Sequence, residues 1–262
     1  MTITQTQTTP ATGARPLTGR VAVVTGATSG IGAATARRLA GDGASIALVG
    51  RRGERLRDLA DELAGATTVP VATDITDPAA LERLVETVHS EIGRVDLVVA
   101  NAGVMLAAPF EQADTGEWDR MLDTNVRGLV HTGRAFVPDL LEAAAGGGRA
   151  DLVHVGSIGG HEVFPNYGVY GATKAAVAHL TRNLRTELGP RGVRVKNIEP
   201  GLVGTELGDD MRDTGIREAL ADWRSEIGAL SPDHIADAIA FAVAAPPHVN
   251  VAEMIVLPTS QG

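Results

Sequence analysis

Cysteine is absent from the sequence, which excludes disulfide bonds, thiolate metal sites and cysteine nucleophiles. Aromatic residues amount to only 3%, so a core has to be built from aliphatic side chains, as in a parallel sheet covered by helices on both faces. No apolar run approaches the length that crosses a bilayer, and residues 1–14 lack the basic residues and the apolar segment of a secretory signal. We therefore expect a cytoplasmic protein in which residues 1–16 form a disordered tail.

Clustered positive charge is also missing. The formal net charge is −9, and the basic residues occur as scattered pairs rather than as a run. Because nucleic-acid and membrane-surface binding depend on basic patches, we expect neither kind of partner, and we predict no bound metal. What is present is a chain of 262 residues with 44% hydrophobic residues, enough for one large α/β domain with a buried core.

Apolar, β-branched segments recur along the chain and alternate with segments of helical spacing. In the clearest helix, residues 81–92 place apolar side chains on one face, with Asp77 as N-cap and Pro78 as the first helical residue. Alternation of strand and helix predicts a doubly wound parallel sheet in a single α/β domain over residues 17–262. The seven predicted strands are 20–25, 44–49, 69–73, 95–100, 151–156, 193–198 and 251–257.

The segment of about 202–230 departs from this alternation. It follows a predicted strand and Pro200-Gly201, and it has mixed charges with weak periodicity. Ligands of open α/β sheets bind beyond the carboxyl ends of the strands, so we expect this segment to be a substrate lid. A surface insertion without a function is the alternative.

A glycine-rich turn links the first predicted strand to a helix. Glycines allow a tight turn and a close approach to a pyrophosphate, and the helix N-terminus offers free N–H groups to the phosphates. A glycine triplet alone could be an ordinary turn, but its place in the first βαβ unit favours dinucleotide binding in a Rossmann-type domain. The predicted contacts are Gly26, Thr28, Ser29, Gly30, Ile31 and Gly32.

Three residues in the second half of the chain have the chemistry for proton transfer. Ser157 follows the fifth predicted strand, and Tyr170 and Lys174 lie four apart on one face of the next helix. An ammonium group beside a phenol favours the phenolate, so we expect Lys174 to lower the pKa of Tyr170 and suit it to acid–base catalysis. The alternative is a solvated Tyr–Lys pair on a helix surface.

Asn125 occupies a position where an apolar residue is expected. It falls on a predicted helical stripe with Trp118, Leu122 and Leu129. Because a buried asparagine must satisfy its hydrogen bonds, it either makes a structural helix-to-loop bond or faces an active site.

The order and spacing of these motifs resemble the single-domain branch of the short-chain dehydrogenase/reductase family, over residues 17–262. The resemblance depends on TGATSGIG at 25–32, NAG at 101–103, Asn125, Ser157, the YxxxK of Tyr170 and Lys174, and PG at 200–201 followed by Thr205. The GRR at 50–52 and the ending APPHVNVAEMIVLPTSQ are similar to a narrower group that includes clavulanate dehydrogenase and NADP-dependent 3-hydroxy acid dehydrogenases. Ala100 and Lys196 depart from the asparagines common in relatives.

The resemblance implies hydride transfer between a nicotinamide and a ketone, aldehyde or secondary alcohol of a small metabolite. It implies a catalytic tetrad in which Tyr170 exchanges the proton, Ser157 positions the substrate oxygen, Lys174 binds the nicotinamide ribose and Asn125 holds a water. Because these residues are retained, a non-catalytic NADP-binding sensor is only the alternative, and an epimerase or dehydratase would need a longer substrate domain.

The resemblance also implies further cofactor contacts and an assembly. Asp74 and Ile75 should border the adenine, and Asn101, with Ala102 and Gly103, the adenine ribose. Helices near 117–142 and 168–188 and the strand near 251–257 should form a homotetramer. The contacts implied toward the nicotinamide are Tyr170, Lys174, Pro200, Gly201, Val203 and Thr205.

The charge pattern after the second strand predicts NADP(H) as the cofactor. NAD-specific relatives have an acid at the position of Gly50 to hold the ribose hydroxyls, and here Arg51 and Arg52 follow instead. Guanidinium groups form charge-assisted bonds to phosphate and suit the 2′-phosphate of NADP. The alternative is that both arginines only begin the next helix.

The substrate pocket is predicted with less detail. Residues expected to line it are Met105, His161, Phe164, Asn166, Leu207 and Met211. Three lid arginines, Arg212, Arg217 and Arg224, could pair with an acidic substrate, but pairing with Asp210, Asp213 or Glu226 is the expected arrangement.

Overall fold

The computed structural model describes residues 15–261. The predicted tail over residues 1–16 therefore lies outside the described residues, except for Arg15 and Pro16. No helix within residues 15–261 is long and apolar enough to cross a membrane.

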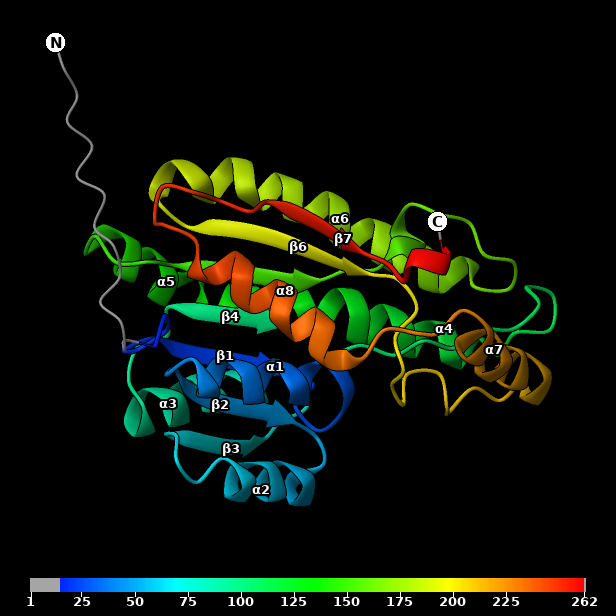
Figure 1. Cartoon of the computed structure of the whole chain (residues 1–262), viewed down its shortest axis with the longest axis horizontal. Coiled ribbons are helices and arrows are strands. Elements are labelled where there is room, and N and C mark those ends of the chain that lie inside the picture. The colour runs from blue at the N-terminus through cyan, green and yellow to red at the C-terminus, as the bar shows by residue number, and fades with distance from the viewer. Residues whose placement is uncertain (1–14, 262) are drawn as a thin grey trace, which may run out of the picture.

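The core of the fold is a seven-stranded parallel sheet in the order β3-β2-β1-β4-β5-β6-β7 (Figure 1). The order reverses between β1 and β4, as the doubly wound Rossmann-type prediction requires. All seven predicted strands are confirmed, with shifts of at most two residues at their ends. They are β1 (Val21–Thr25), β2 (Ser45–Gly50), β3 (Thr68–Ala72), β4 (Leu97–Ala100), β5 (Asp151–Val155), β6 (Arg194–Pro200) and β7 (Glu253–Val256).

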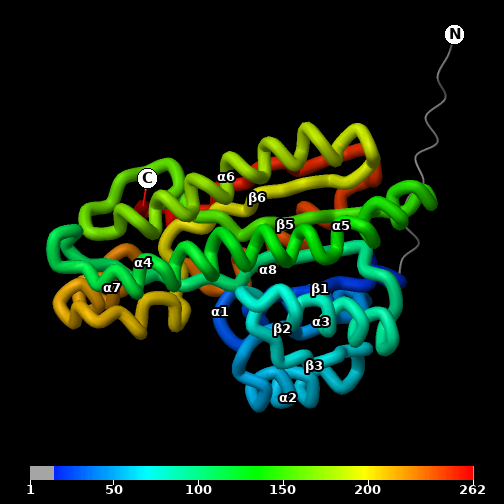
Figure 2. Tube along the Cα trace, turned by 180° about the vertical axis from the view of Figure 1, so that it is seen from behind, coloured from blue at the N-terminus to red at the C-terminus, as the bar shows by residue number. Residues whose placement is uncertain are grey.

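Helices cover both faces of the sheet. Ala22 and Val24 of β1 pack in one aliphatic cluster and Val23 in another, because successive side chains of a strand point to opposite faces. The first face is covered by α1 (Gly30–Gly41), α2 (Gly53–Glu62) and α8 (Pro232–Ala244). The second face, which is nearer the viewer in Figure 2, is covered by α3 (Pro78–Glu91), α5 (Leu129–Ala145) and α6 (Gly168–Leu188).

Local signals place the start of α3 correctly. The Asp77 side chain accepts a hydrogen bond from the backbone N–H of Ala79 at 2.9 Å, and Pro78 is the first helical residue. A proline is tolerated there because that N–H has no partner within the helix.

One continuous helical segment combines α4 (Thr115–Met121), a π-helical stretch (Leu122–Gly128) and α5. The wider π-helical turn shifts the phase of the side chains, so the predicted stripe through Trp118, Leu122, Asn125 and Leu129 is wrong at Leu122. Leu122 is 47% exposed, whereas Asn125 is 1% exposed.

The segment between β6 and α8 lies beyond the carboxyl ends of the strands, where Figure 1 shows α7 (Thr214–Glu226) beside α4. Its two ends are joined by backbone hydrogen bonds. The Leu230 N–H donates to the Leu202 carbonyl, and the Gly204 N–H donates to the Leu230 carbonyl, both at 2.9 Å. The predicted lid therefore forms a loop whose two ends, near Leu202 and Leu230, are hydrogen-bonded to each other.

Lys196, which departs from the asparagine common in the family that the sequence resembles, lies near the opposite end of the sheet. Its ammonium is fully buried, donates to Asn250 Oδ1 at 2.7 Å and lies 3.3 Å from Asp151 Oδ1. Burial lowers the pKa of Lys196 to about 8. This residue joins β6 to the segment before β7 and has no contact with the site described below.

Candidate active site

A cleft of about 850 Å³ opens at the carboxyl ends of the strands. Ligands of doubly wound sheets bind at this edge, where the strand order reverses. All the predicted catalytic and cofactor residues line the cleft except Gly32 and Asn125, which lie behind its wall. The tertiary structure therefore brings together residues that are spread from position 26 to position 205.

The glycine turn forms one wall of the cleft. Gly26 has a φ of +70°, and a Cβ added there would lie 2.9 Å from the Cα of Ala102. A Cβ on Gly32 would lie 2.2 Å from the Gly26 carbonyl oxygen. Since neither contact is tolerable, glycine is required at both positions. Ser29, the N-cap of α1, makes no capping bond with its side chain, so the first N–H groups of α1 point to the cleft without that partner.

Thr25, which sequence reasoning missed as a site residue, joins this turn to the turn after β4. Its buried hydroxyl oxygen accepts hydrogen bonds from the backbone N–H groups of Asn101 and Ala102 at 3.0 and 3.1 Å. The Asn101 side chain in turn donates to the Thr25 carbonyl at 3.0 Å. A threonine that ends a strand just before a glycine turn was the only signal in the sequence.

Two arginines lie at the end of the cleft formed by β2. Arg52 donates to the hydroxyl oxygens of Thr28 and Ser29 at 2.8 Å and forms an ion pair of 2.9 Å with Glu206, a second residue that the sequence reasoning missed. Arg51 is exposed, and its charge contributes to the lowered pKa of Asp74, after the hydrogen bonds from Thr76. Within residues 15–261 no ion pair of Arg51 is found.

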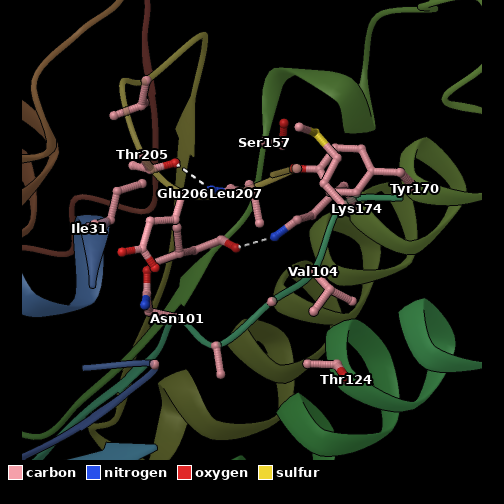
Figure 3. A pocket seen from close by; sticks show the side chains of 18 of the residues that line it. Ile31, Asn101, Val104, Thr124, Ser157, Tyr170, Lys174, Thr205, Glu206 and Leu207 are labelled. Atoms are coloured by element: carbon pink, nitrogen blue, oxygen red, sulfur yellow. Dashed lines mark hydrogen bonds between the residues drawn. The ribbon is translucent and has the colours of Figure 1, made fainter. Parts of the chain in front are cut away.

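Ser157, Tyr170 and Lys174 lie together at the other end of the cleft. Figure 3 shows their side chains near one another, while Ile31 and Asn101 lie across the cavity. Tyr170 and Lys174 are each 7% exposed, so they are not a solvated surface pair. Lys174 Nζ donates to the Val155 carbonyl oxygen at 2.9 Å, and Ser157 Oγ accepts from the Gly159 N–H at 3.1 Å.

The expected lowering of the Tyr170 pKa by Lys174 is wrong for this structure. Burial raises the pKa of Tyr170, and the nearby Ser157 hydroxyl acts in the opposite direction. The Lys174 ammonium lies 5.9 Å from the centre of the Tyr170 ring, and burial lowers the pKa of Lys174 to about 8. At neutral pH the phenol therefore keeps its proton, which is the form that can donate to a carbonyl oxygen.

Asn125 makes the helix-to-loop bonds that were one of its two predicted roles. Its Oδ1 accepts from the Val104 N–H at 2.8 Å, and its Nδ2 donates to the Val104 carbonyl at 2.9 Å and to Thr173 Oγ1 at 3.1 Å. These bonds connect the π-helical stretch, the loop after β4 and α6. Asn125 therefore supports the wall of the cleft, and its role with a bound water stays a prediction.

Comparison with known proteins agrees with this geometry. The family model described as short chain dehydrogenase matches residues 20–215. The chain belongs to the short-chain dehydrogenase/reductase family. It is 39% identical to sulfoacetaldehyde reductase 2 of Chromohalobacter salexigens over 92% of this chain and 95% of that protein. It is 37% identical to an uncharacterized oxidoreductase of Staphylococcus aureus strain USA300, covering 92% and 98% of the two chains.

Solved structures of short-chain dehydrogenases/reductases are similar over nearly the whole chain. The closed form of a serine dehydrogenase complexed with NADP+ superposes with a TM-score of 0.85 at 35% identity, covering 92% of this chain and 96% of that one. An alcohol dehydrogenase from Thermococcus sibiricus complexed with 5-hydroxy-NADP has a TM-score of 0.82 at 31% identity, covering 93% and 98%. The protein is thus an oxidoreductase of this family.

The substrate part of the cleft in this oxidoreductase has aromatic and aliphatic side chains, with charged side chains of α4 and the predicted lid also lining the cleft. Three predicted lining residues, Met105, Phe164 and Leu207, are confirmed. His161, Asn166 and Met211 do not line the cleft, and His161 Nε2 instead lies 2.7 Å from Glu199 Oε1. Residues of the lid and of α6 that were not anticipated complete the wall, namely Tyr167, Leu220, Trp223 and Arg224.

The predicted pairing of the lid arginines is wrong. Arg212 pairs with Asp114, and Arg217 lies 3.5 Å from the carbonyl oxygen of Met211. Asp210 pairs with Arg120, and Asp213 caps α7 by accepting from the Ile216 N–H at 3.0 Å. Folding of the lid against α4 brings these partners within reach, although they are distant in the sequence.

Arg224 is the lid arginine that reaches the cleft. Its Nη2 donates to the Leu207 carbonyl at 2.6 Å, and its Nη1 lies 3.7 Å from the exposed Asp209 carboxylate. The side chain is only 16% exposed, and burial lowers its pKa. A mostly buried guanidinium, paired at 3.7 Å with the exposed Asp209, is thereby placed beside Tyr167 and Trp223 in the substrate part of the cleft.

Proposed function

We propose that this protein is an NADP(H)-dependent enzyme that transfers a hydride between nicotinamide and the carbonyl or alcohol carbon of a small metabolite. The observation that supports this most is the single cleft with a glycine turn at one end and Ser157, Tyr170 and Lys174 at the other. The alternative of a non-catalytic NADP-binding sensor has no observation in its favour, since Ser157, Tyr170 and Lys174 all line the cleft and the last two are buried.

The residues of the cleft fit a nicotinamide dinucleotide. Because Gly26 and Gly32 have no side chains, a pyrophosphate has space to approach the turn. The free N–H groups at the start of α1 can then bind its oxygens. When bound, the cofactor supplies or accepts the hydride. During reduction Tyr170 donates its proton to the carbonyl oxygen, and the Ser157 hydroxyl holds that oxygen. The Lys174 ammonium binds the ribose and supplies the proton that Tyr170 has given up.

A preference for NADP(H) over NAD(H) follows from the charges near β2. Gly50 provides no carboxylate for the adenosine ribose, and Arg51 and Arg52 both line the cleft at this point. Guanidinium groups suit the 2′-phosphate of NADP. The serine dehydrogenase and the Thermococcus sibiricus alcohol dehydrogenase, both similar in structure, were solved with NADP+ and 5-hydroxy-NADP.

The substrate is proposed to carry an anionic group. Arg224 supplies a positive charge next to the Phe164 and Trp223 rings, whose centres lie 5.7 Å apart, in a cleft that Asp209 and the paired Arg120 and Asp210 also line. Serine dehydrogenase and sulfoacetaldehyde reductase, to which the chain is similar, are named for substrates that carry a carboxylate and a sulfonate. A short oxo acid or hydroxy acid is therefore the proposed substrate class.

The Arg224 assignment predicts a loss that depends on the charge of the substrate. With NADPH, the wild type should reduce sulfoacetaldehyde or malonic semialdehyde faster than the uncharged methyl ester of the latter. Arg224→Met should lower kcat/KM for the anionic aldehydes by about 10- to 150-fold, the value of a hydrogen bond to a charged group, and leave the ester within about threefold.

Arg212→Met is the matched control, because this lid arginine is 70% exposed and does not line the cleft. It should leave the kinetics of both aldehydes unchanged. Equal losses on ester and acid in Arg224→Met would instead show that Arg224 only holds the lid through Leu207. Absence of any NADPH-dependent turnover across the panel would contradict the proposed function.

The protein is also proposed to form a homotetramer. The continuous α4–α5 segment exposes Leu122 and Val130, and α6 exposes the small Ala172, Ala175 and Ala176, which permit close helix approach. A separate pair of exposed apolar side chains, Phe241 of α8 and Ile255 of β7, is 65% and 51% exposed. Two such surfaces suit two different interfaces of a tetramer with dihedral symmetry.

Light scattering at micromolar concentration should give four times the chain mass. Phe241→Glu should reduce this to a dimer, because a charge would be buried at one interface while the other interface stays intact. A wild-type protein that is monomeric under these conditions would refute the assembly.

A further inference from the structure

The short 3₁₀-helix η4 (Thr259–Gln261) returns the chain to the cleft after β7. Gln261 lines the cleft together with Tyr170 and Gly201. Its side-chain oxygen Oε1 accepts a hydrogen bond from the backbone N–H of Leu202 at 2.8 Å. A side chain from the far end of the described residues is therefore bonded to the loop that follows β6.

Gly201 is packed directly against this side chain. A Cβ added at Gly201 would lie 2.3 Å from Gln261 Oε1 and 2.7 Å from Leu257 Cδ2, so only glycine allows the approach. The Gly201 N–H also donates to the Val256 carbonyl at 2.8 Å. The glycine of the PG motif is thus needed for packing against the segment 256–261, in addition to any role toward a ligand.

Leu202 is held from two sides. Gln261 binds its N–H, and its carbonyl oxygen accepts from the Leu230 N–H at 2.9 Å at the end of the lid. The neighbouring Ser260 hydroxyl donates to the Ile227 carbonyl at 2.5 Å, just after α7. The segment 256–261 therefore fixes both the start of the lid and its return, at the point where the two meet.

We propose that Gln261 is a positioning residue for the nicotinamide end of the cofactor site. This inference rests on the proposed function, which places the nicotinamide beside Tyr170 and the loop 201–205. By accepting from the Leu202 N–H, Gln261 holds this loop in the conformation in which Val203 and Thr205 border the cleft. Without the acceptor, a mostly buried N–H loses its partner and the loop gains alternative conformations.

The test separates the two ends of the cofactor. Dissociation constants of NADPH, NADH and adenosine 2′,5′-bisphosphate, which lacks the nicotinamide, are measured by calorimetric titration of the full chain. Gln261→Met keeps the size of the side chain and removes the acceptor. It should weaken NADPH and NADH by the same factor, about three- to tenfold for one hydrogen bond, and leave the bisphosphate within twofold.

Two further variants complete the design. Gln261→Glu retains an acceptor oxygen at the same reach and should restore NADPH binding to within twofold of the wild type. Thr259→Ala changes an exposed residue of the same 3₁₀-helix and should alter no dissociation constant. Thermal midpoints of all variants are compared, since a purely structural role would lower the midpoint without distinguishing the ligands.

Equal weakening of the bisphosphate and NADPH in Gln261→Met, or no weakening of either, would overturn the inference. A wild-type protein that binds the bisphosphate but neither dinucleotide would overturn the proposed function itself. The variant therefore tests the inference about Gln261, and the wild type tests the proposed function.

Discussion

Tyr170→Phe is expected to lower kcat by about 10²–10⁴-fold while NADPH binding stays within about twofold, because general acid catalysis contributes this much and the change removes only one hydroxyl. Tyr170 is buried, and burial raises its pKa so that it carries a proton at neutral pH. Its loss leaves the carbonyl oxygen without a proton donor. Stopped-flow measurement of NADPH oxidation, with separate titration of NADPH, checks both parts.

Tyr167→Phe provides a matched control for this experiment. Tyr167 lines the same cleft three residues earlier and is also partly buried, and burial raises its pKa too. Its environment includes Arg224 rather than the Ser157 hydroxyl. This variant should retain kcat within about tenfold. Near-native turnover by Tyr170→Phe on any accepted substrate would remove Tyr170 from the proton-transfer role.

Arg51→Ala is expected to weaken NADPH binding by about 10- to 150-fold and to leave NADH almost unchanged, since a hydrogen bond to a charged group contributes about 1.5–3 kcal/mol. The structure distinguishes the two arginines. Arg52 already binds Thr28, Ser29 and Glu206, whereas Arg51 is exposed at the cleft. Arg51 can therefore bind the 2′-phosphate without first breaking an ion pair, and Arg52→Ala should have the smaller effect.

Arg57→Ala is the control, because Arg57 is an exposed arginine of α2 that does not line the cleft. It should change neither affinity. Introducing an acid at Gly50 is a less direct test, since a Cβ there would lie 2.8 Å from the Thr28 methyl group and press on the phosphate turn. Equal losses of NADH and NADPH in Arg51→Ala would mean that Arg51 supports the loop, and a wild type that prefers NADH would contradict the cofactor assignment.

Local sequence patterns predicted the helices and strands and most of the residues that line the cleft. Strand positions follow from apolar runs, and the start of α3 follows from Asp77 and Pro78, because both depend on interactions within a few residues. Gly26 and Ser157 follow β1 and β5, and both lie at the cleft because parallel strands bring their carboxyl ends to one edge. The topology of the parallel sheet is therefore enough to bring motifs that follow different strands into one site.

Other features were beyond the sequence because they depend on contacts between distant segments. The π-helical turn moved Leu122 out of its predicted stripe, and burial reversed the expected pKa shift of Tyr170. The lid arginines found partners on α4 or on backbone carbonyls, since the fold of the lid decides which acid is within reach.

The sequence by itself determined the family, the doubly wound sheet and the residue types of the proposed catalytic group, since each follows from residue types at fixed spacing. Only the tertiary structure decided that Arg224 faces the cleft, that Glu206 pairs with Arg52, and that Gln261 holds the loop after β6. The Arg52–Glu206 and Leu202–Gln261 contacts join residues 154 and 59 positions apart, and no local pattern encodes which distant partner a polar side chain meets once the backbone has folded.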